Sequence, residues 1–299
     1  MSTPSATTAG LPASGARQLA ADLVALTKPK VQSLLLLTTV AAMLAAGDPP
    51  IELIVATVIG GYLSAGGAGA VNHWYDRDID VQMARTATRP VAAGRIPPTV
   101  ALWYGIALGV AGFAWLALTT NLLAASLSFS GFLGYTLLYT VWLKRRTWQN
   151  IVWGGIAGAV PPLVGWAAVT GSLTGLPLYL FAIVFFWTPP HFWALSLLMK
   201  DEYARVGVPM LPVVRGEQET RRQIVLYSFL LYAITQLPFC AGGLGVIYLV
   251  GSLGLGVVFC TMAVALYRNP SKRAALRLYL FSLLYLALLF AAVVADVKL

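Results

Sequence analysis

The chain has 299 residues, of which 59% are hydrophobic and 10% are charged, and its formal net charge at pH 7 is +9. Soluble domains carry about 25% charged residues, so this composition excludes an ordinary soluble globular protein and indicates one that crosses a membrane several times. Its two cysteines, Cys240 and Cys260, lie inside apolar segments, which argues against a disulfide framework or a cysteine metal site.

Nine apolar segments are long enough to span a bilayer, since a spanning helix needs roughly 20 mostly apolar residues. We expect an all-α, polytopic membrane protein in which residues 23–299 form one transmembrane domain. Residues 1–22 are rich in Ser, Thr, Ala and Gly, and we expect a flexible tail there without a cleavable signal peptide. The first helix is expected to begin near Ala20, because its apolar run alone is short. The predicted spans are Val31–Ala46, Ile51–Tyr75, Pro97–Leu118, Leu122–Leu143, Ile151–Val169, Leu178–Met199, Ile224–Ala241, Leu244–Leu266 and Ala274–Val294.

The distribution of Lys and Arg predicts the orientation of these spans. The tail and the even-numbered connections hold 19 of the 20 basic residues, and Lys298 alone falls on the other side. Basic residues favour the cytoplasmic face, so we expect the N-terminus inside and the C-terminus outside. The net charge is then a topology signal that attracts anionic lipid headgroups, and it gives no indication of nucleic-acid binding.

The second predicted span runs directly into the stretch Asn72-His73-Trp74-Tyr75-Asp76-Arg77-Asp78-Ile79-Asp80, which holds three of the chain's 11 acidic residues. If the helix continues through it at about 100° per residue, Asn72, Asp76 and Asp80 lie within about 80° of one another, and Asp78 faces the far side. Carboxylates at the end of a membrane span are costly to desolvate, and two of them one turn apart suit a divalent cation that brings a substrate phosphate. The motif therefore predicts a metal–phosphate site in which Asn72, Asp76 and Asp80 are catalytic and the two carboxylates bind metal.

A second acidic pair, Asp201 and Glu202, follows the sixth predicted span and emerges on the same side of the membrane. Together with the first motif, this pair would hold more than one divalent ion, which makes a bridged diphosphate a better leaving group. Two alternatives stay open. The pair balances nearby basic residues in solvent, or the carboxylates of the first motif pair with Arg77 and Arg85.

Basic residues near the acidic motifs, or at the start of a helix, are the candidates for binding a diphosphate. Arg suits phosphate through its fork of donors, and Lys acts as a point charge. The other basic residues serve orientation and contact lipid headgroups. The candidates are Lys30, Arg85, Arg89, Lys144, Arg145 and Arg146.

The chain has two histidines, His73 and His191, and both lie on the helices that carry the acidic clusters. The prolines of Pro189-Pro190-His191 bend the sixth span. A buried histidine is more often a hydrogen-bonded core residue than a ligand, and the alternative here is an axial or orienting role towards a bound macrocycle. Covalent c-type haem attachment is excluded, because the sequence has no CxxCH.

Several phrases spread over residues 26–212 form a pattern that is similar to a known family. With Asn72-xxx-Asp76-xxx-Asp80 and nine spans, the chain resembles the UbiA superfamily of intramembrane prenyltransferases, and within it the haem farnesyltransferases (haem O synthases). The phrases are Leu26-Thr27-Lys28-Pro29-Lys30, Arg85-Thr86-x-x-Arg89-Pro90, Tyr139-Thr140-x-x-Leu143-Lys144-Arg145-Arg146-Thr147, Asn150-Ile151-Val152-x-Gly154-Gly155, Ala159-x-Pro161-Pro162-Leu163-x-Gly165-Trp166, Trp187-Thr188-Pro189-Pro190-His191-Phe192-Trp193-Ala194-Leu195 and Asp201-x-Tyr203-Ala204-Arg205-x-Gly207-Val208-Pro209-Met210-Leu211-Pro212.

This resemblance implies a Mg²⁺-dependent transfer of a farnesyl group from farnesyl diphosphate to the 2-vinyl group of haem b (protohaem IX), giving haem O and diphosphate. It implies that Asn72, Asp76 and Asp80 form the first metal–diphosphate motif, with the active site facing the cytoplasm of a bacterial inner membrane. It also implies membrane lipid, a haem A synthase and a second copy of the chain as partners. Relatives that prenylate quinone rings carry a second DxxxD-like motif near the sixth helix, and Asp201-Glu202 is the nearest equivalent here.

Two other functions stay open at this point. A prenyltransferase of the same family acting on a quinone precursor or another tetrapyrrole keeps the chemistry, but the missing second DxxxD and the phrase Pro189-Pro190-His191 argue against it. A membrane transporter belongs to another class. Its carboxylates would lie near the middle of broken helices, whereas these cluster at the predicted cytoplasmic ends, and no clear internal repeat is present.

Overall fold

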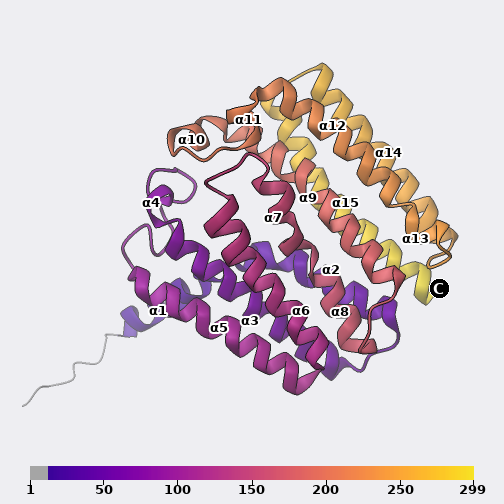
Figure 1. The fold of residues 1–299 in the computed structure, drawn as a ribbon, viewed down its shortest axis with the longest axis horizontal. Helices are drawn as coiled ribbons and strands as arrows, with labels where there is room; N and C mark the ends of the chain where they lie inside the picture. Colours follow the sequence, from indigo (N-terminus) through magenta and orange to yellow (C-terminus); the bar gives the residue numbers. More distant parts are fainter. Residues whose placement is uncertain (1–12) are drawn as a thin grey trace, which may run out of the picture.

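The computed structural model describes residues 13–299, which fold into a bundle of helices (Figure 1). Within this part of the chain, nine helical segments are long and apolar enough to cross a membrane, which confirms the predicted all-α, nine-span organisation. The segments are α2 (Pro29–Ala46), α3 (Ile51–Tyr75), α5 (Pro98–Thr119), α6 with η1 (Leu122–Leu133, Gly134–Leu143), α7 with α8 (Asn150–Ala159, Pro161–Thr170), α9 (Gly175–Leu198), α12 with α13 (Gly216–Ile234, Leu237–Cys240), α14 (Val246–Arg268) and α15 (Lys272–Lys298).

The observed spans begin and end within about four residues of the predicted ones, except at the start of the seventh. This span begins at Gly216 and not at Ile224, because the polar segment before the apolar run is helical as well. Hydropathy finds the part of a helix that meets lipid, and it misses a polar turn that extends beyond the bilayer.

The N-terminal region differs from the prediction. The first span does not begin near Ala20, because α1 (Ala13–Leu26) is a separate helix and the chain turns at Lys28 before α2 starts. Of the predicted flexible tail, residues 13–22 are helical, and residues 1–12 lie outside the described part of the chain.

An ion pair holds α1 against the connection between α3 and α5. Asp22 is buried, and both of its carboxylate oxygens accept hydrogen bonds from Arg95 Nε at 3.0 Å. Arg95 Nη2 also donates to the carbonyl oxygen of Thr88, in the same connection. The hydrogen bonds from Arg95 hold the pKa of Asp22 below its usual 3.8, so the carboxylate is charged at neutral pH.

We expect the substitution Asp22→Asn to lower the free energy of unfolding by about 1 kcal/mol, because it removes a charge-assisted hydrogen bond whose Arg partner is partly exposed. The melting temperature in detergent should fall by about 2 °C. Since the folded-state pKa is depressed, this stabilisation is present above the ordinary carboxyl pKa and is lost as the pH falls through the folded value. The variant and the wild type should therefore converge in acid. Arg17→Gln, on the exposed side of α1, is the control, and an equal loss in both variants would contradict this account.

Helix α3, which carries the first acidic motif, packs closely against α5. A Cβ added at Gly67 would lie 2.5 Å from the carbonyl oxygen of Gly105, and one at Gly105 would lie 2.7 Å from that of Gly67. No side chain larger than hydrogen fits at either position. Such close backbone approach drives helix association in lipid, where apolar side chains gain nothing from leaving water. It fixes α3 and so the position at which the motif emerges.

Two connections that are far apart in sequence meet at one end of the bundle. They contain the short helices α4 (Arg77–Asp80), α10 (Lys200–Arg205) and α11 (Leu211–Val214), which Figure 1 shows at the end away from the C-terminus. Ile79 and Met83 from the first connection pack in one apolar cluster with Met199 and Tyr203 from the second. This cluster brings the two acidic segments to the same end of the protein.

Candidate active site

The first acidic motif occupies the end of α3 and all of α4. It is not the one continuous helix on which the predicted spacing was based, because α3 ends at Tyr75 and Asp76 caps it with φ −86° and ψ 5°. Backbone hydrogen bonds nevertheless keep the four-residue spacing: Asp76 N donates to the Asn72 carbonyl at 2.9 Å, and Asp80 N donates to the Asp76 carbonyl at 2.8 Å. Asn72, Asp76 and Asp80 are all at most 3% exposed. The three predicted residues therefore lie together in the interior.

Asn72 connects three elements through its side-chain amide. Its Oδ1 accepts a hydrogen bond from Lys28 Nζ at 2.5 Å, and its Nδ2 donates to Asp76 Oδ2 at 2.7 Å and to Thr140 Oγ1 at 3.2 Å. Lys28 lies between α1 and α2, and Thr140 lies in η1. The amide is thus held from both sides, with its oxygen turned towards a cation.

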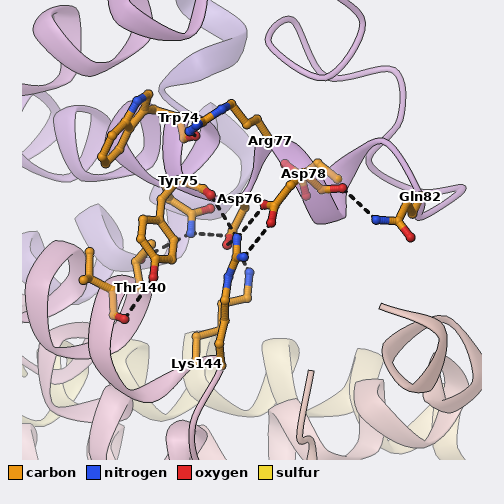
Figure 2. Close-up of polar contacts among 12 residues, drawn as sticks. Trp74, Tyr75, Asp76, Arg77, Asp78, Gln82, Thr140 and Lys144 are labelled. Atoms are coloured by element: carbon orange, nitrogen blue, oxygen red, sulfur yellow. Dashed lines mark hydrogen bonds and ion pairs between the residues drawn. The ribbon is translucent and has the colours of Figure 1, made fainter. Parts of the chain in front are cut away.

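Two cations from the end of η1 reach Asp76. Lys144 Nζ donates to Asp76 Oδ2, and Arg145 Nη2 lies 3.5 Å from Asp76 Oδ1. Arg145 also forms a two-pronged pair with the half-exposed Asp78, with distances of 2.6 and 2.7 Å. Figure 2 shows the side chains of Asp76, Asp78 and Lys144 turned towards one another. Asp78, which the sequence leaves out of the metal site, lies at the surface and pairs with Arg145.

Asp80 is held by a different cation. Arg89 Nη1 donates to both of its oxygens, at 2.9 and 2.7 Å. The alternative partners weighed from the sequence do not hold these carboxylates: Arg77 donates to the carbonyl of Trp74 and lies over the Trp74 ring, and Arg85 is exposed. Four basic side chains, Lys28, Arg89, Lys144 and Arg145, lie around the three carboxylates, and this arrangement suits an anion.

The π-helix η1 explains how one segment supplies several of these groups. In a π-helix each N–H bonds five residues back, and Lys144 N donates to the Tyr139 carbonyl in this way at 2.8 Å. Residues five apart, such as Tyr135 with Thr140 and Tyr139 with Lys144, then face the same side. The Tyr135 ring lies on the side of η1 that faces Lys28, whose Nζ is 5.9 Å from the ring centroid. Such segments are common at functional sites, and nothing in the sequence signalled this one.

Three predicted diphosphate ligands do not reach this cluster. Lys30, Arg85 and Arg146 are exposed, and no hydrogen bond or ion pair joins their side chains to the acidic motif. Burial raises the pKa of Tyr203, and the charge of Arg85 opposes this shift, so Arg85 lies near the second connection. Arg89, Lys144 and Arg145 are the predicted cations that the structure brings together.

The second acidic pair lies in α10. Asp201 is exposed, whereas Glu202 has a buried Oε2 with no hydrogen-bond partner. Its neighbour Tyr203 packs in the cluster with Ile79, next to the first motif. Among the described residues, no three Asp, Glu, His or Cys side chains gather closely enough to form a ready metal cluster. The pair thus lies at the same end of the bundle as the first motif, and Glu202 is the residue of the two with a buried carboxylate oxygen.

Buried carboxylate oxygens that accept no hydrogen bond test whether these residues suit a divalent ion. Asp76 Oδ1 accepts no hydrogen bond although it is fully buried, and the same holds for Glu202 Oε2. Leaving such a group unsatisfied costs about 1–3 kcal/mol. A Mg²⁺ ion takes oxygen ligands of this type and favours a site shared with substrate phosphates. The donor set therefore fits magnesium.

Lys28 is the site residue that sequence reasoning missed, having selected Lys30. It adopts φ 54° and ψ 57°, the only positive φ of a non-glycine residue between 13 and 299. The following residue, Pro29, excludes the ordinary helical conformation at this position, which was the available signal. Removal from water, together with the charges of Arg89 and Lys144, lowers the pKa of Lys28 from 10.5 to about 7. The strained backbone therefore directs a cation into the site.

The two histidines have different surroundings. His73 is 2% exposed, and neither ring nitrogen has a hydrogen-bond partner. His191 lies in α9, where its Nδ1 is 2.6 Å from Ser282 Oγ in α15. Phe192, next to it, packs in the cluster that contains Ile79 and Met83. His191 is thus near the end of the bundle that holds the acidic motif.

Comparison with known proteins gives one consistent family. Residues 34–289 match the UbiA prenyltransferase family. A protoheme IX farnesyltransferase from Symbiobacterium thermophilum is 52% identical over 284 residues, which are 94% of this chain and 95% of that protein. One from Roseiflexus sp. (strain RS-1) is 54% identical over 94% of this chain and 53% of that protein. The chain spans about half the length of this and several other curated relatives.

Solved structures share the fold. A structure concerned with digeranylgeranylglyceryl phosphate synthase in membranes superposes with a TM-score of 0.77 at 16% identity, covering 94% of this chain and 99% of that one. A UbiA homologue from Archaeoglobus fulgidus bound to DMAPP and Mg²⁺ superposes with a TM-score of 0.70 at 16% identity, covering 91% and 99%. At this identity the likeness concerns the arrangement of the helices.

Proposed function

The chain belongs to the UbiA prenyltransferase family, and we propose that it is an integral membrane enzyme that transfers a farnesyl group from farnesyl diphosphate to the 2-vinyl group of haem b. The products are haem O and diphosphate. The C1–O bond of the farnesyl donor breaks, a carbon–carbon bond forms at the vinyl group, and water adds to the resulting cation.

One observation carries the proposal: the buried Asn72, Asp76 and Asp80 are surrounded by cations at the end of a membrane-spanning bundle. Buried carboxylates in a membrane protein indicate a functional site. The match of 52% over nearly the full length of a protoheme IX farnesyltransferase supports the choice of donor and acceptor. The positive-inside rule supports a site that faces the cytoplasm of a bacterial inner membrane.

The residues divide into two groups by charge. Asp76 and Asp80 would hold Mg²⁺, with Asn72 Oδ1 and Glu202 as further oxygen ligands. When bound, the metal supplies neutralisation of the charge that develops on the diphosphate oxygens. On substrate binding, Lys144 and Arg89 would exchange their carboxylate partners for phosphate oxygens. Lys28 would release Asn72 Oδ1 and Arg145 would turn from Asp78, so that both donate to the diphosphate as well.

The same arrangement suits the departure of an allylic diphosphate. Tyr135 of η1 presents its ring face to Lys28, and its centroid lies 5.4 Å from that of Tyr139. Ring faces stabilise positive charge as the C1–O bond breaks. For the acceptor, His73 and His191 are the candidate contacts with haem, and His191 is the better placed because one of its ring nitrogens is already held.

A direct assay tests this function. Purified protein in detergent with Mg²⁺, haem b and farnesyl diphosphate should give haem O, resolved by mass, and the reaction should stop with EDTA and resume with added Mg²⁺. Because Mg²⁺ would be held by shared carboxylates, its removal should lower the rate by at least about a hundredfold. Prenylation of a quinone precursor without haem O would replace the acceptor in this proposal. Neither product, with solute flux in vesicles, would overturn it in favour of a transporter.

A further inference from the structure

His191 is held by one hydrogen bond and by two stacked aromatic rings. Its ring stacks on Trp187 at a centroid distance of 4.4 Å and on Tyr279 at 4.8 Å, with interplanar angles of 19° and 27°. Its Nδ1 lies 2.6 Å from Ser282 Oγ. Trp187 Nε1 in turn donates to the Ser282 carbonyl at 2.8 Å. Ser282 therefore fixes both the histidine and one of the rings that flank it.

The hydrogen bonds of Ser282 determine which nitrogen of His191 carries the proton. A serine hydroxyl has one proton, and here it is donated to the Tyr279 carbonyl at 2.6 Å. The remaining contact with His191 therefore needs Nδ1–H as the donor and Oγ as the acceptor. In a neutral imidazole this places the free lone pair on Nε2.

The free nitrogen is not enclosed like those of His73. Nε2 of His191 forms no hydrogen bond. Among the described residues, the fully buried polar atoms without a hydrogen-bond partner include both nitrogens of His73 but not this atom, so Nε2 of His191 keeps some accessible surface. A histidine that binds a metal through one nitrogen almost always donates its other N–H to an oxygen that orients the ring. His191 has this arrangement before any ligand is present.

We propose that Ser282 is a positioning residue that presents Nε2 of His191 as an axial ligand to the iron of the acceptor haem. This inference rests on the proposed function, since it concerns how the haem substrate is held. Ligation through Nε2 fixes the macrocycle beside α9, and Phe192 links this position to the apolar cluster next to the acidic motif. Ser282 does not touch the iron and acts only through the imidazole.

The spectrum of bound haem b is the readout, measured on the 299-residue protein in detergent without farnesyl diphosphate. Wild-type protein should give the absorption and iron–histidine stretching bands of an imidazole-ligated haem. His191→Gly should lose these bands, and added imidazole should restore them. An unchanged spectrum in His191→Gly, or its loss in His73→Gln with retention in His191→Gly, would overturn the proposal.

The role of Ser282 is tested by a matched pair of variants. Ser282→Ala should weaken haem binding about tenfold, as is typical for the loss of a partner behind a metal ligand, and should shift the iron–histidine stretch. Ser282→Thr keeps the hydroxyl and should restore the wild-type values. Ser228→Ala is the control, because the hydroxyl of that buried serine donates to the Ile224 carbonyl and contacts no histidine. Equal effects of Ser282→Ala and Ser228→Ala, with the stretch unmoved, would reject a positioning role.

The outcome for this inference is separable from that for the proposed function. If the protein makes haem O but its haem spectrum is independent of His191, the ligation inference fails and the activity stands. If no haem O forms although the histidine-ligated spectrum is present and sensitive to Ser282, the site binds haem and the proposed transfer fails.

Discussion

Replacing Asp76 or Asp80 by Asn should lower the rate of farnesyl transfer by at least about a hundredfold, the size of effect seen when one group that stabilises developing charge is removed. Both side chains are almost completely buried and pair with cations. An amide keeps the shape but loses the negative charge that a divalent ion needs. Initial rates of haem O formation at saturating haem and farnesyl diphosphate measure the effect.

Asp78→Asn is the matched control for this experiment, because it makes the same chemical change two residues along the chain from both Asp76 and Asp80. Asp78 has a side chain that is 58% exposed and pairs only with Arg145. Its rate should stay within about threefold of wild type, as expected for an exposed ion pair. A similar loss in Asp76→Asn and Asp78→Asn would contradict a special role for the buried carboxylates.

Loss of folding must be separated from loss of chemistry. Asp76→Asn leaves Lys144 buried without its partner, and breaking a buried pair costs about 3–5 kcal/mol. The double variant Asp76→Asn with Lys144→Met removes both charges and should recover most of the melting temperature. If the double variant also recovers turnover, Asp76 is a structural partner of Lys144 and not a ligand.

The spans were predictable because the bilayer imposes a length and a composition on each of them. The buried Asn72, Asp76 and Asp80 were predictable as well, since four-residue spacing survives the end of α3 through the hydrogen bond from Asp80 N to the Asp76 carbonyl. The continuous helix assumed in that argument was wrong, but the side chains still converge. Local helical periodicity was therefore enough to predict that these three side chains lie together.

The partners of the carboxylates could not be predicted in the same way. Asp80 is held by Arg89, nine residues away, and not by the nearer Arg85, because the intervening loop folds back through the Thr86 hydroxyl, which donates to the Asp80 carbonyl at 3.0 Å. Asp76 is held by Lys144, which only the π-helical turn of η1 brings to face α3. Both ion pairs depend on tertiary packing, which cannot be predicted from how close two residues are in the sequence.

The second acidic segment shows the same limit. Asp201 and Glu202 are adjacent and look equivalent in the sequence, yet Asp201 is exposed and Glu202 Oε2 is buried without a partner. Which of the two faces inward is decided by Tyr203, whose packing against Ile79 anchors α10.

Lys28→Gln and Lys30→Gln form the sharpest comparison that the chain offers, because the two lysines are two residues apart in the same phrase. We expect Lys28→Gln to lower kcat/KM for farnesyl diphosphate by about 10- to 100-fold, the worth of one charge-assisted hydrogen bond. Lys28 Nζ already lies 2.5 Å from Asn72 Oδ1, whereas Lys30 is exposed and should change the rate by less than about twofold. Steady-state kinetics with varied farnesyl diphosphate decide between the two.

Stability should move in the opposite direction from activity at Lys28. Desolvation lowers the pKa of this group to about 7, so the folded protein binds its proton less tightly than the unfolded chain does between that value and 10.5. The substitution Lys28→Gln removes the free-energy cost of burying this charge, so its melting temperature should equal or exceed that of wild type at neutral pH. If Lys28 served mainly to stabilise the fold, its substitution would instead lower the melting temperature and leave the kinetics unchanged. Lower stability with unchanged kinetics in Lys28→Gln would therefore remove Lys28 from the diphosphate site and return the choice to Lys30.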